Sequence, residues 1–195
     1  MALNDTMIDF DYRSFVLKDH YFDHFSTLHG INHTYRVMYH VLNIGRKAAL
    51  NHDVRLAFCA AFIHDMARLH DSYCTEHGIR AVKRKLPVFR QLFAQTGVDN
   101  EGMRAIKLAV ANHSIRHEIS KSNPYYHTVA LLKDADALDR IRIGEHNLKV
   151  EYLRYPETVG LVDFAKELYY CSDGSIIQNM DELIGLAVDL GESPF

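Results

Sequence analysis

Histidine and aspartate interrupt apolar helical segments at three separate places in the chain. The segment Val54–Ile63 is almost entirely apolar and is followed directly by His64 and Asp65. An adjacent imidazole and carboxylate are costly to place in so apolar a setting unless they are paired or bind a ligand. His33 lies on the apolar face of a second predicted helix, and Asp136 lies on the apolar face of a third. The sequence therefore predicts that three helices direct polar side chains toward a common core.

These residues have the chemistry of metal ligands. Together they offer imidazole nitrogens and carboxylate oxygens but no thiolate, which suits Mn, Fe, Co, Ni, Zn or Mg with coordination positions left for water. The chain holds 13 histidines in 195 residues, and imidazole can bind metal or carry protons near neutral pH. Metal or proton chemistry is therefore the first expectation.

The elements that must position these residues are predicted to be helices. Apolar residues recur at helical spacing, and no convincing alternation typical of strands is present, although the stretch 125–128 could be locally extended. Pro87 is expected to kink or restart one helix, and Gly144 and Gly174 are expected to break others. The predicted helical regions are 37–48, 54–65, 79–93, 106–110, 128–143, 159–170 and 176–190. We expect an all-α bundle with the segment 54–65 at its centre.

Composition limits the classes of protein that the chain can be. A length of 195 residues with 48% apolar and 24% charged residues fits one domain, and no linker divides the chain. The net charge of −3 argues against a nucleic acid or an anionic membrane as partner. The longest strongly apolar stretch, Ala57–Ile63, is too short to span a membrane, and Met1–Tyr12 has no basic leader or apolar core. Three cysteines without a C-x-x-C pair are typical of reduced thiols, so we expect a cytoplasmic protein.

Five segments resemble the HD-domain metal-dependent phosphohydrolase superfamily. HGINHTYRV, AAFIHDMAR and LLKDADALDRIR are similar to its H…HD…D signature. Glu76-His77-Gly78 resembles its E-H-x-x-(G/S) segment, and IKLAVANHS resembles its I-x-x-A-(I/V)-x-x-H-S helix. The resemblance implies a single HD domain over residues 1–195, an all-α helical bundle. Its motif-bearing core would cover about 28–143, and a helical C-terminal extension would cover about 145–195.

The resemblance also implies a ligand set. His33, His64, Asp65 and Asp136 would hold the first divalent metal ion. Helical geometry does not separate Asp136 from Asp134, and Asp136 is favoured because it matches the aspartate of the family's A-D-x-L string.

Three further residues are implied to contact a second metal ion or the substrate. His113 and His77 match positions that bind a second ion in some subfamilies and the substrate phosphate in others. His113 lies at i+3 from Val110 on the apolar face, whereas His77 falls opposite the apolar stripe of its helix unless a loop folds it over the site. Arg68 lies one turn after Asp65 and is expected to bind the substrate phosphate.

The implied activity is hydrolysis of a phosphomonoester or phosphodiester of a nucleotide or similar small molecule by attack of metal-bound hydroxide. The chain lacks the H-H pair and G-Y-P loop of cyclic-di-GMP phosphodiesterases and the E-D motif of guanosine tetraphosphate hydrolases. Two alternatives remain open: an HD-type di-iron oxygenase, and a non-catalytic nucleotide-sensing HD module that the intact ligand set disfavours. A homodimer would be unsurprising for a bundle of this size.

Overall fold

The computed structural model describes residues 9–193, and it places α-helices and short 3-10 helices but no strand among them. The prediction of an all-α fold is therefore confirmed. Residues 1–8, on which the expectation of no leader partly rests, lie outside the described residues.

The helices follow one another with short connections. The α-helices are α1 (Ile31–Lys47), α2 (Asn51–Ile63), α3 (His77–Arg84), α4 (Leu86–Gln95), α5 (Asn100–Asn112), α6 (Tyr126–Leu138), α7 (Pro156–Val159), α8 (Val162–Ser172) and α9 (Met180–Asp189). The 3-10 helices are η1 (Tyr12–Ser14), η2 (Asp19–Tyr21), η3 (Asp139–Ile143), η4 (Glu145–Asn147) and η5 (Val150–Tyr152). Among residues 9–193, no helix combines the length and apolar character needed to cross a membrane.

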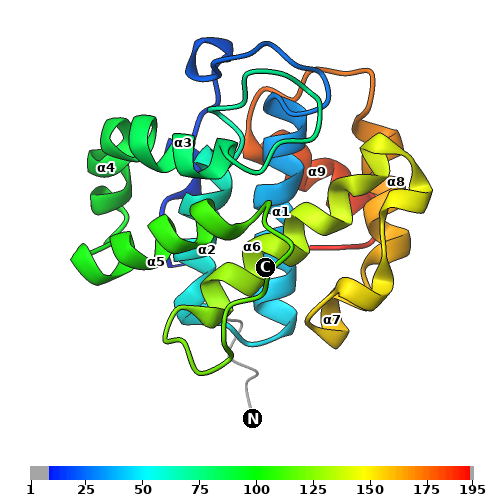
Figure 1. The fold of residues 1–195 in the computed structure, drawn as a ribbon. Helices are drawn as coiled ribbons and strands as arrows, with labels where there is room; N and C mark the ends of the chain where they lie inside the picture. Colours follow the sequence, from blue (N-terminus) through cyan, green and yellow to red (C-terminus); the bar gives the residue numbers. More distant parts are fainter. Residues whose placement is uncertain (1–8, 194–195) are drawn as a thin grey trace.

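Helices α1, α2 and α6 form the centre of the bundle, with α3–α5 on one side and α7–α9 on the other (Figure 1). Helix α2 packs against α1, α5 and α6, and its residues 56–63 are all buried. A helix that is apolar nearly all round must be covered on every side. The predicted central position of this segment is confirmed.

The segment 79–93 forms two helices, because the chain restarts at α4 with Pro87 in its first turn. Proline has no backbone N–H to donate, and the first turn of a helix needs none. The buried face of α3 differs from the predicted stripe: Ile79 is 43% exposed, whereas His77, Gly78 and Ala81 are buried. A Cβ atom on Gly78 would lie 2.2 Å from the Val110 carbonyl oxygen. The small residues thus let α3 approach the backbone of α5, and this close approach decides which face is buried.

The expectation of an extended stretch at 125–128 is wrong. The Asn123 side chain accepts a hydrogen bond from the Tyr125 amide (2.9 Å), and the Tyr126 amide donates to the Asn123 carbonyl (3.0 Å). This turn leads straight into α6, which begins at Tyr126. The polar side chain of asparagine competes for backbone donors and favours a turn over a strand.

The C-terminal helices are attached to the N-terminal end of α1. The side chain of Asn32 accepts from the Ile177 amide (3.0 Å) and donates to the Ser175 carbonyl (2.5 Å). The predicted breaks at Gly144 and Gly174 are confirmed, since both have positive φ values, of 112° and 90°. Helices α8 and α9 therefore return to the part of α1 that carries His33.

Candidate metal centre

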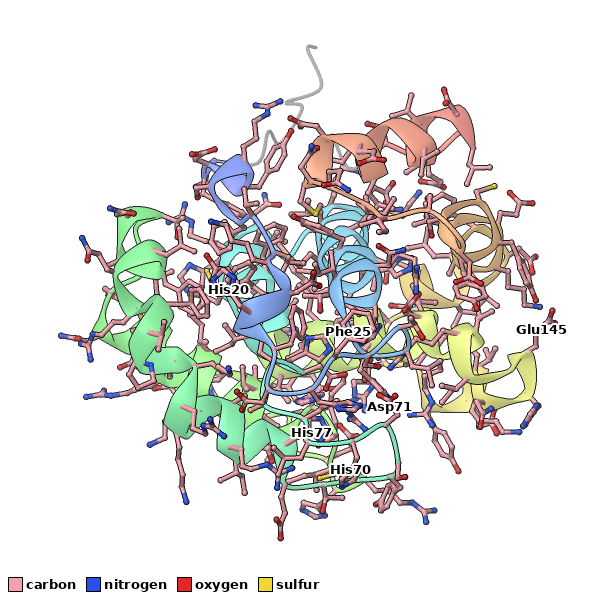
Figure 2. All side chains as sticks on the ribbon, turned by 90° about the horizontal axis from the view of Figure 1, so that it is seen from above. His20, Phe25, His70, Asp71, His77 and Glu145 are labelled. Carbon is pink, nitrogen blue, oxygen red and sulfur yellow. The ribbon has the colours of Figure 1, made fainter. Side chains whose placement is uncertain are left out.

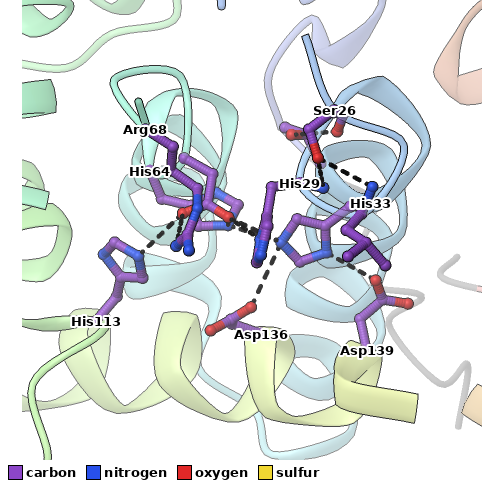
Figure 3. A network of polar contacts seen from close by, with 12 residues as sticks. Ser26, His29, His33, His64, Arg68, His113, Asp136 and Asp139 are labelled. Atoms are coloured by element: carbon purple, nitrogen blue, oxygen red, sulfur yellow. Dashed lines mark hydrogen bonds and ion pairs between the residues drawn. The ribbon is translucent and has the colours of Figure 1, made fainter. Parts of the chain in front are cut away.

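The polar residues predicted from the three helices meet in one buried cluster, where the ends of several helices come together (Figure 3). His33 lies in the first turn of α1, His64 and Asp65 directly follow α2, and Asp136 lies on α6. His33 Nε2 is 3.1 Å from His64 Nε2, 3.5 Å from Asp65 Oδ2 and 3.5 Å from Asp136 Oδ1. The structure thus brings all four proposed ligands of the first ion together.

Two of the histidines are positioned by the same local device at the end of a helix. His64 Nδ1–H donates to the carbonyl of Ala61 (2.6 Å), and His113, which directly follows α5, donates in the same way to Val110 (2.8 Å). The last carbonyl groups of a helix have no partner within the helix, so a histidine three residues later can satisfy one of them. This bond fixes the proton on Nδ1 and leaves Nε2 with a lone pair.

His33 reaches the same state through a side-chain partner. Its Nδ1–H donates to Asp139 Oδ2 (2.7 Å), so its Nε2 also presents a lone pair. The lone pairs of His33 and His64 therefore face each other across 3.1 Å. Two facing lone pairs repel unless a cation lies between or beside them, and metal-bound histidines commonly donate their other N–H in this way. The donor set fits a divalent cation.

A second group of histidines lies on the other side of Asp65. His77 Nε2 is 3.0 Å and His113 Nε2 is 3.5 Å from Asp65 Oδ1, and the two nitrogens are 2.8 Å apart. Asp65 Oδ1 is buried and accepts no hydrogen bond within residues 9–193. Each oxygen of Asp65 thus faces a different set of imidazoles, and either oxygen would contribute to holding a cation.

His77 belongs to this cluster although the helical stripe had placed it on the opposite face. It is the first residue of α3 and is only 1% exposed. The stripe was misread because Gly78 packs against α5 and Ala81 is buried, whereas Ile79 is exposed. With the buried face corrected, His77 points toward Asp65.

Arg68 and His29 border the cluster. Arg68 Nη1 is 3.6 Å from Asp65 Oδ1 and Nη2 donates to the Ser72 carbonyl (3.0 Å), while its buried Nε–H has no acceptor among the described residues. His29 Nδ1 lies 2.8 Å from Asp65 Oδ2. Arg68 is therefore close enough to the cluster to meet an anion bound there.

Burial and charge set the protonation of the cluster. Burial lowers the pKa of His64 to about 3, so its imidazole stays neutral and available as a ligand. Burial opposes ionisation of both Asp65 and Asp136. The charge of Arg142 and nearby histidines nonetheless hold the pKa of Asp136 at about 2, and nearby histidines hold the pKa of Asp65 well below its usual range. Burial also opposes a charge on His113, yet the nearby Asp65 carboxylate, 3.5 Å from His113 Nε2, raises its pKa. A cation at Asp65 would compete with a proton on His113.

Helical geometry could not decide whether Asp134 or Asp136 is the last ligand, but the two side chains have different environments in the structure. Asp136 faces His33, whereas Asp134 is buried on the other side of α6. Asp134 accepts hydrogen bonds from the Arg154 guanidinium (2.7 Å), the Arg154 amide (2.9 Å) and the Thr158 hydroxyl (2.9 Å). The contacts of Asp134 attach α7 to the bundle and leave Asp136 as the carboxylate that points to the cluster.

Sequence reasoning missed Asp139 and Arg142. Asp139 is fully buried and binds both His33 and the Arg36 guanidinium, and Arg142 Nη2 lies 3.8 Å from Asp136 Oδ1. A weak signal was available, because Asp139 follows Asp136 by three residues and so lies near it on a helical surface.

The comparisons with known proteins give one match. A family model described as HD domain matches residues 30–141, which is more than half of the chain. The chain itself matches no curated protein and no solved structure.

Proposed function

Because the chain belongs to the HD domain family, whose members are mostly metal-dependent hydrolases, we propose that it is a phosphohydrolase acting on a nucleotide or a similar small phosphate ester. One observation carries this proposal. The imidazoles of His33, His64 and His113 converge on the Asp65 carboxylate, and the Nδ1–H of each is already hydrogen-bonded to another acceptor. His33, His64, Asp65 and Asp136 would hold the first ion, and His77 and His113 would hold a second or contact the substrate.

The chemistry of such a site follows from its charges. A bound divalent cation supplies water of lowered pKa and neutralises phosphoryl oxygens. Arg68 would orient the phosphate, because its guanidinium lies beside the cluster with one N–H that has no acceptor within residues 9–193. His113 would hydrogen-bond a phosphoryl oxygen or donate its proton to the leaving oxygen, since the nearby Asp65 carboxylate raises its pKa.

Two exposed aromatic side chains, in the loops that also carry His29 and Arg68, support a substrate with a planar group. Phe25 is 76% exposed and Tyr73 is 87% exposed, although large aromatic side chains are usually buried. Ser72, the neighbour of Tyr73, binds Arg68. The Ser26 hydroxyl donates to Asp71 (2.5 Å) and so joins the loops that carry the two rings. Phe25 and Asp71, one from each loop, are labelled in Figure 2. Each ring offers a face on which a nucleobase can stack.

A di-iron oxygenase is the second candidate. The arrangement of His77 and His113 about Asp65 Oδ1, with His33 and His64 nearer Oδ2, favours two adjacent cations. Nitrogen and carboxylate ligands of this kind suit iron as well as manganese.

The test is metal analysis of the purified protein followed by a panel of phosphomonoesters and phosphodiesters with Mn, Co, Ni and Mg. We expect bound divalent metal and phosphate release without oxygen, and we expect Asp65→Ala to lose both. Asp134→Asn is the matched control, because it removes a buried charge that does not contact the cluster.

Two results would contradict the proposal. Undiminished hydrolysis by folded Asp65→Ala protein would refute the assigned site. About two irons per chain, an oxygen-dependent absorbance and no phosphate release would instead establish the oxygenase.

A further inference from the structure

A buried chain of hydrogen bonds connects His33 to the C-terminal helix α8. His33 Nδ1–H donates to Asp139 Oδ2 (2.7 Å), and the Arg36 guanidinium donates to both oxygens of Asp139 (2.6 and 3.1 Å). Arg36 also donates to the Ser172 hydroxyl (3.2 Å) and lies 5.0 Å from the centre of the Tyr169 ring. Ser172 and Tyr169 lie beyond the matched residues 30–141.

The four residues joined by these hydrogen bonds are all buried. His33 and Ser172 are completely buried, and Asp139 and Arg36 are 1% and 2% exposed. Buried charges need partners, and a guanidinium held against a carboxylate through two hydrogen bonds has little freedom to turn. Asp139 therefore presents a fixed acceptor to His33.

The fixed acceptor determines which nitrogen of His33 can bind a cation. As long as Nδ1 carries the proton, Nε2 points at His64 and Asp136 with its lone pair free. If the proton moved to Nε2, the ring could no longer bind the ion through the nitrogen that faces the cluster.

We propose that Asp139 is a positioning residue that keeps His33 Nε2 available to the ion, and that Arg36 and α8 hold it in place. The C-terminal extension thus helps to set metal affinity at a site whose proposed ligands all lie within the HD-matched segment. The inference rests on the proposed metal site but not on hydrolysis.

The substitution Asp139→Asn tests this with almost no change of shape. An asparagine amide has one acceptor oxygen and one donor NH2 group. If the NH2 group faces Arg36 Nε, two donors meet; if it faces His33, the amide donates to Nδ1 and drives the proton to Nε2. The second orientation keeps the shorter of the two Arg36 bonds, from Nε (2.6 Å rather than 3.1 Å), so we expect the amide to donate to His33.

The experiment measures cobalt affinity by calorimetry and the His33 tautomer by ¹⁵N NMR of histidine-labelled protein, with His33→Gln assigning the signal. We expect Asp139→Asn to bind cobalt about 10- to 100-fold more weakly and to lose the Nδ1–H tautomer of His33. Asp134→Asn is the control, because Asp134 is buried but contacts none of the proposed ligands. This variant should bind cobalt within about threefold of wild type, since no group around the ion changes.

Ser172→Ala is the milder variant, which decides the question if Asp139→Asn does not fold. It removes the acceptor of Arg36 Nη1 without touching a proposed ligand, and we expect a loss of affinity of roughly two- to fivefold, below that of removing a direct partner of a ligand.

Unchanged affinity and an unchanged tautomer in folded Asp139→Asn protein would overturn the inference. Unchanged affinity in folded Ser172→Ala protein would overturn it as well, because the proposal has Arg36 and α8 hold Asp139 in place. Wild-type protein that binds cobalt but hydrolyses nothing would count against the proposed function alone. If the wild type binds no cobalt, the tautomer of His33 in the two aspartate variants still decides the role of Asp139.

Discussion

His40 should make the protein less stable as the pH falls, and its replacement by leucine should remove that loss. The side chain is completely buried in α1, edge-on to the rings of Tyr39 and Phe164. Neither ring nitrogen has a hydrogen-bond partner among the described residues. Burial lowers the pKa of His40 to about 4, with a smaller opposing effect from the charge of Asp139.

The sign and size of the effect follow from proton linkage. Between pH 4 and pH 6.5 the unfolded chain binds a proton at His40 that the folded chain does not, so stability falls as the pH falls through this range. With an unfolded pKa of about 6.5, the loss between pH 7 and pH 5 is about 2 kcal/mol, and the full loss below pH 4 is about 3 kcal/mol.

The assay is urea unfolding of wild type and His40→Leu at pH 7 and pH 5, in the presence of a chelator. All other ionisable groups are the same in both proteins, so the difference between them isolates His40. We expect the variant to gain about 2 kcal/mol relative to wild type on going from pH 7 to pH 5. It should not be less stable at pH 7, because removing a buried polar group without partners relieves a desolvation penalty. An equal pH dependence in the two proteins would refute the reasoning, since it would mean that His40 is protonated or hydrogen-bonded in the fold.

Two further predictions concern the packing around the site. Gly78→Ala should lower the free energy of unfolding by about 1–3 kcal/mol, because the new Cβ atom would lie 2.2 Å from the Val110 carbonyl oxygen and the backbone there cannot easily move aside. Urea unfolding measures this loss, and an unchanged unfolding midpoint would contradict the close packing of α3 on α5. Arg154→Ala should cost about 3 kcal/mol of stability by leaving the buried Asp134 without its charged partner. Its cobalt affinity should stay that of wild type, and a parallel loss of affinity would show that α7 is coupled to the metal centre.

The sequence was sufficient to predict the central helices, because their burial follows from composition alone. The segment 54–63 is apolar nearly all round, so only a central position could satisfy it. His64 and Asp65 were predictable as part of the site for the same reason, since polar groups at the end of such a helix require a partner. The faces of α3 were not predictable in this way, because Gly78 and Ala81 carry little hydrophobic signal and the contact that buries them comes from the backbone of α5.

The residues that sequence reasoning missed act through partners distant in the chain. Asp139 orients His33 across 106 residues, and Arg36 connects it to Ser172 across 136. Helical spacing ranks positions on one helix, but it cannot show which carboxylate of one helix faces which imidazole of another. His64 and His113 differ from His33 in this respect, because each takes its Nδ1–H acceptor from the helix that it follows. Two of the three anchored imidazoles are therefore encoded locally, and the third depends on the packing of α1 against η3 and α8.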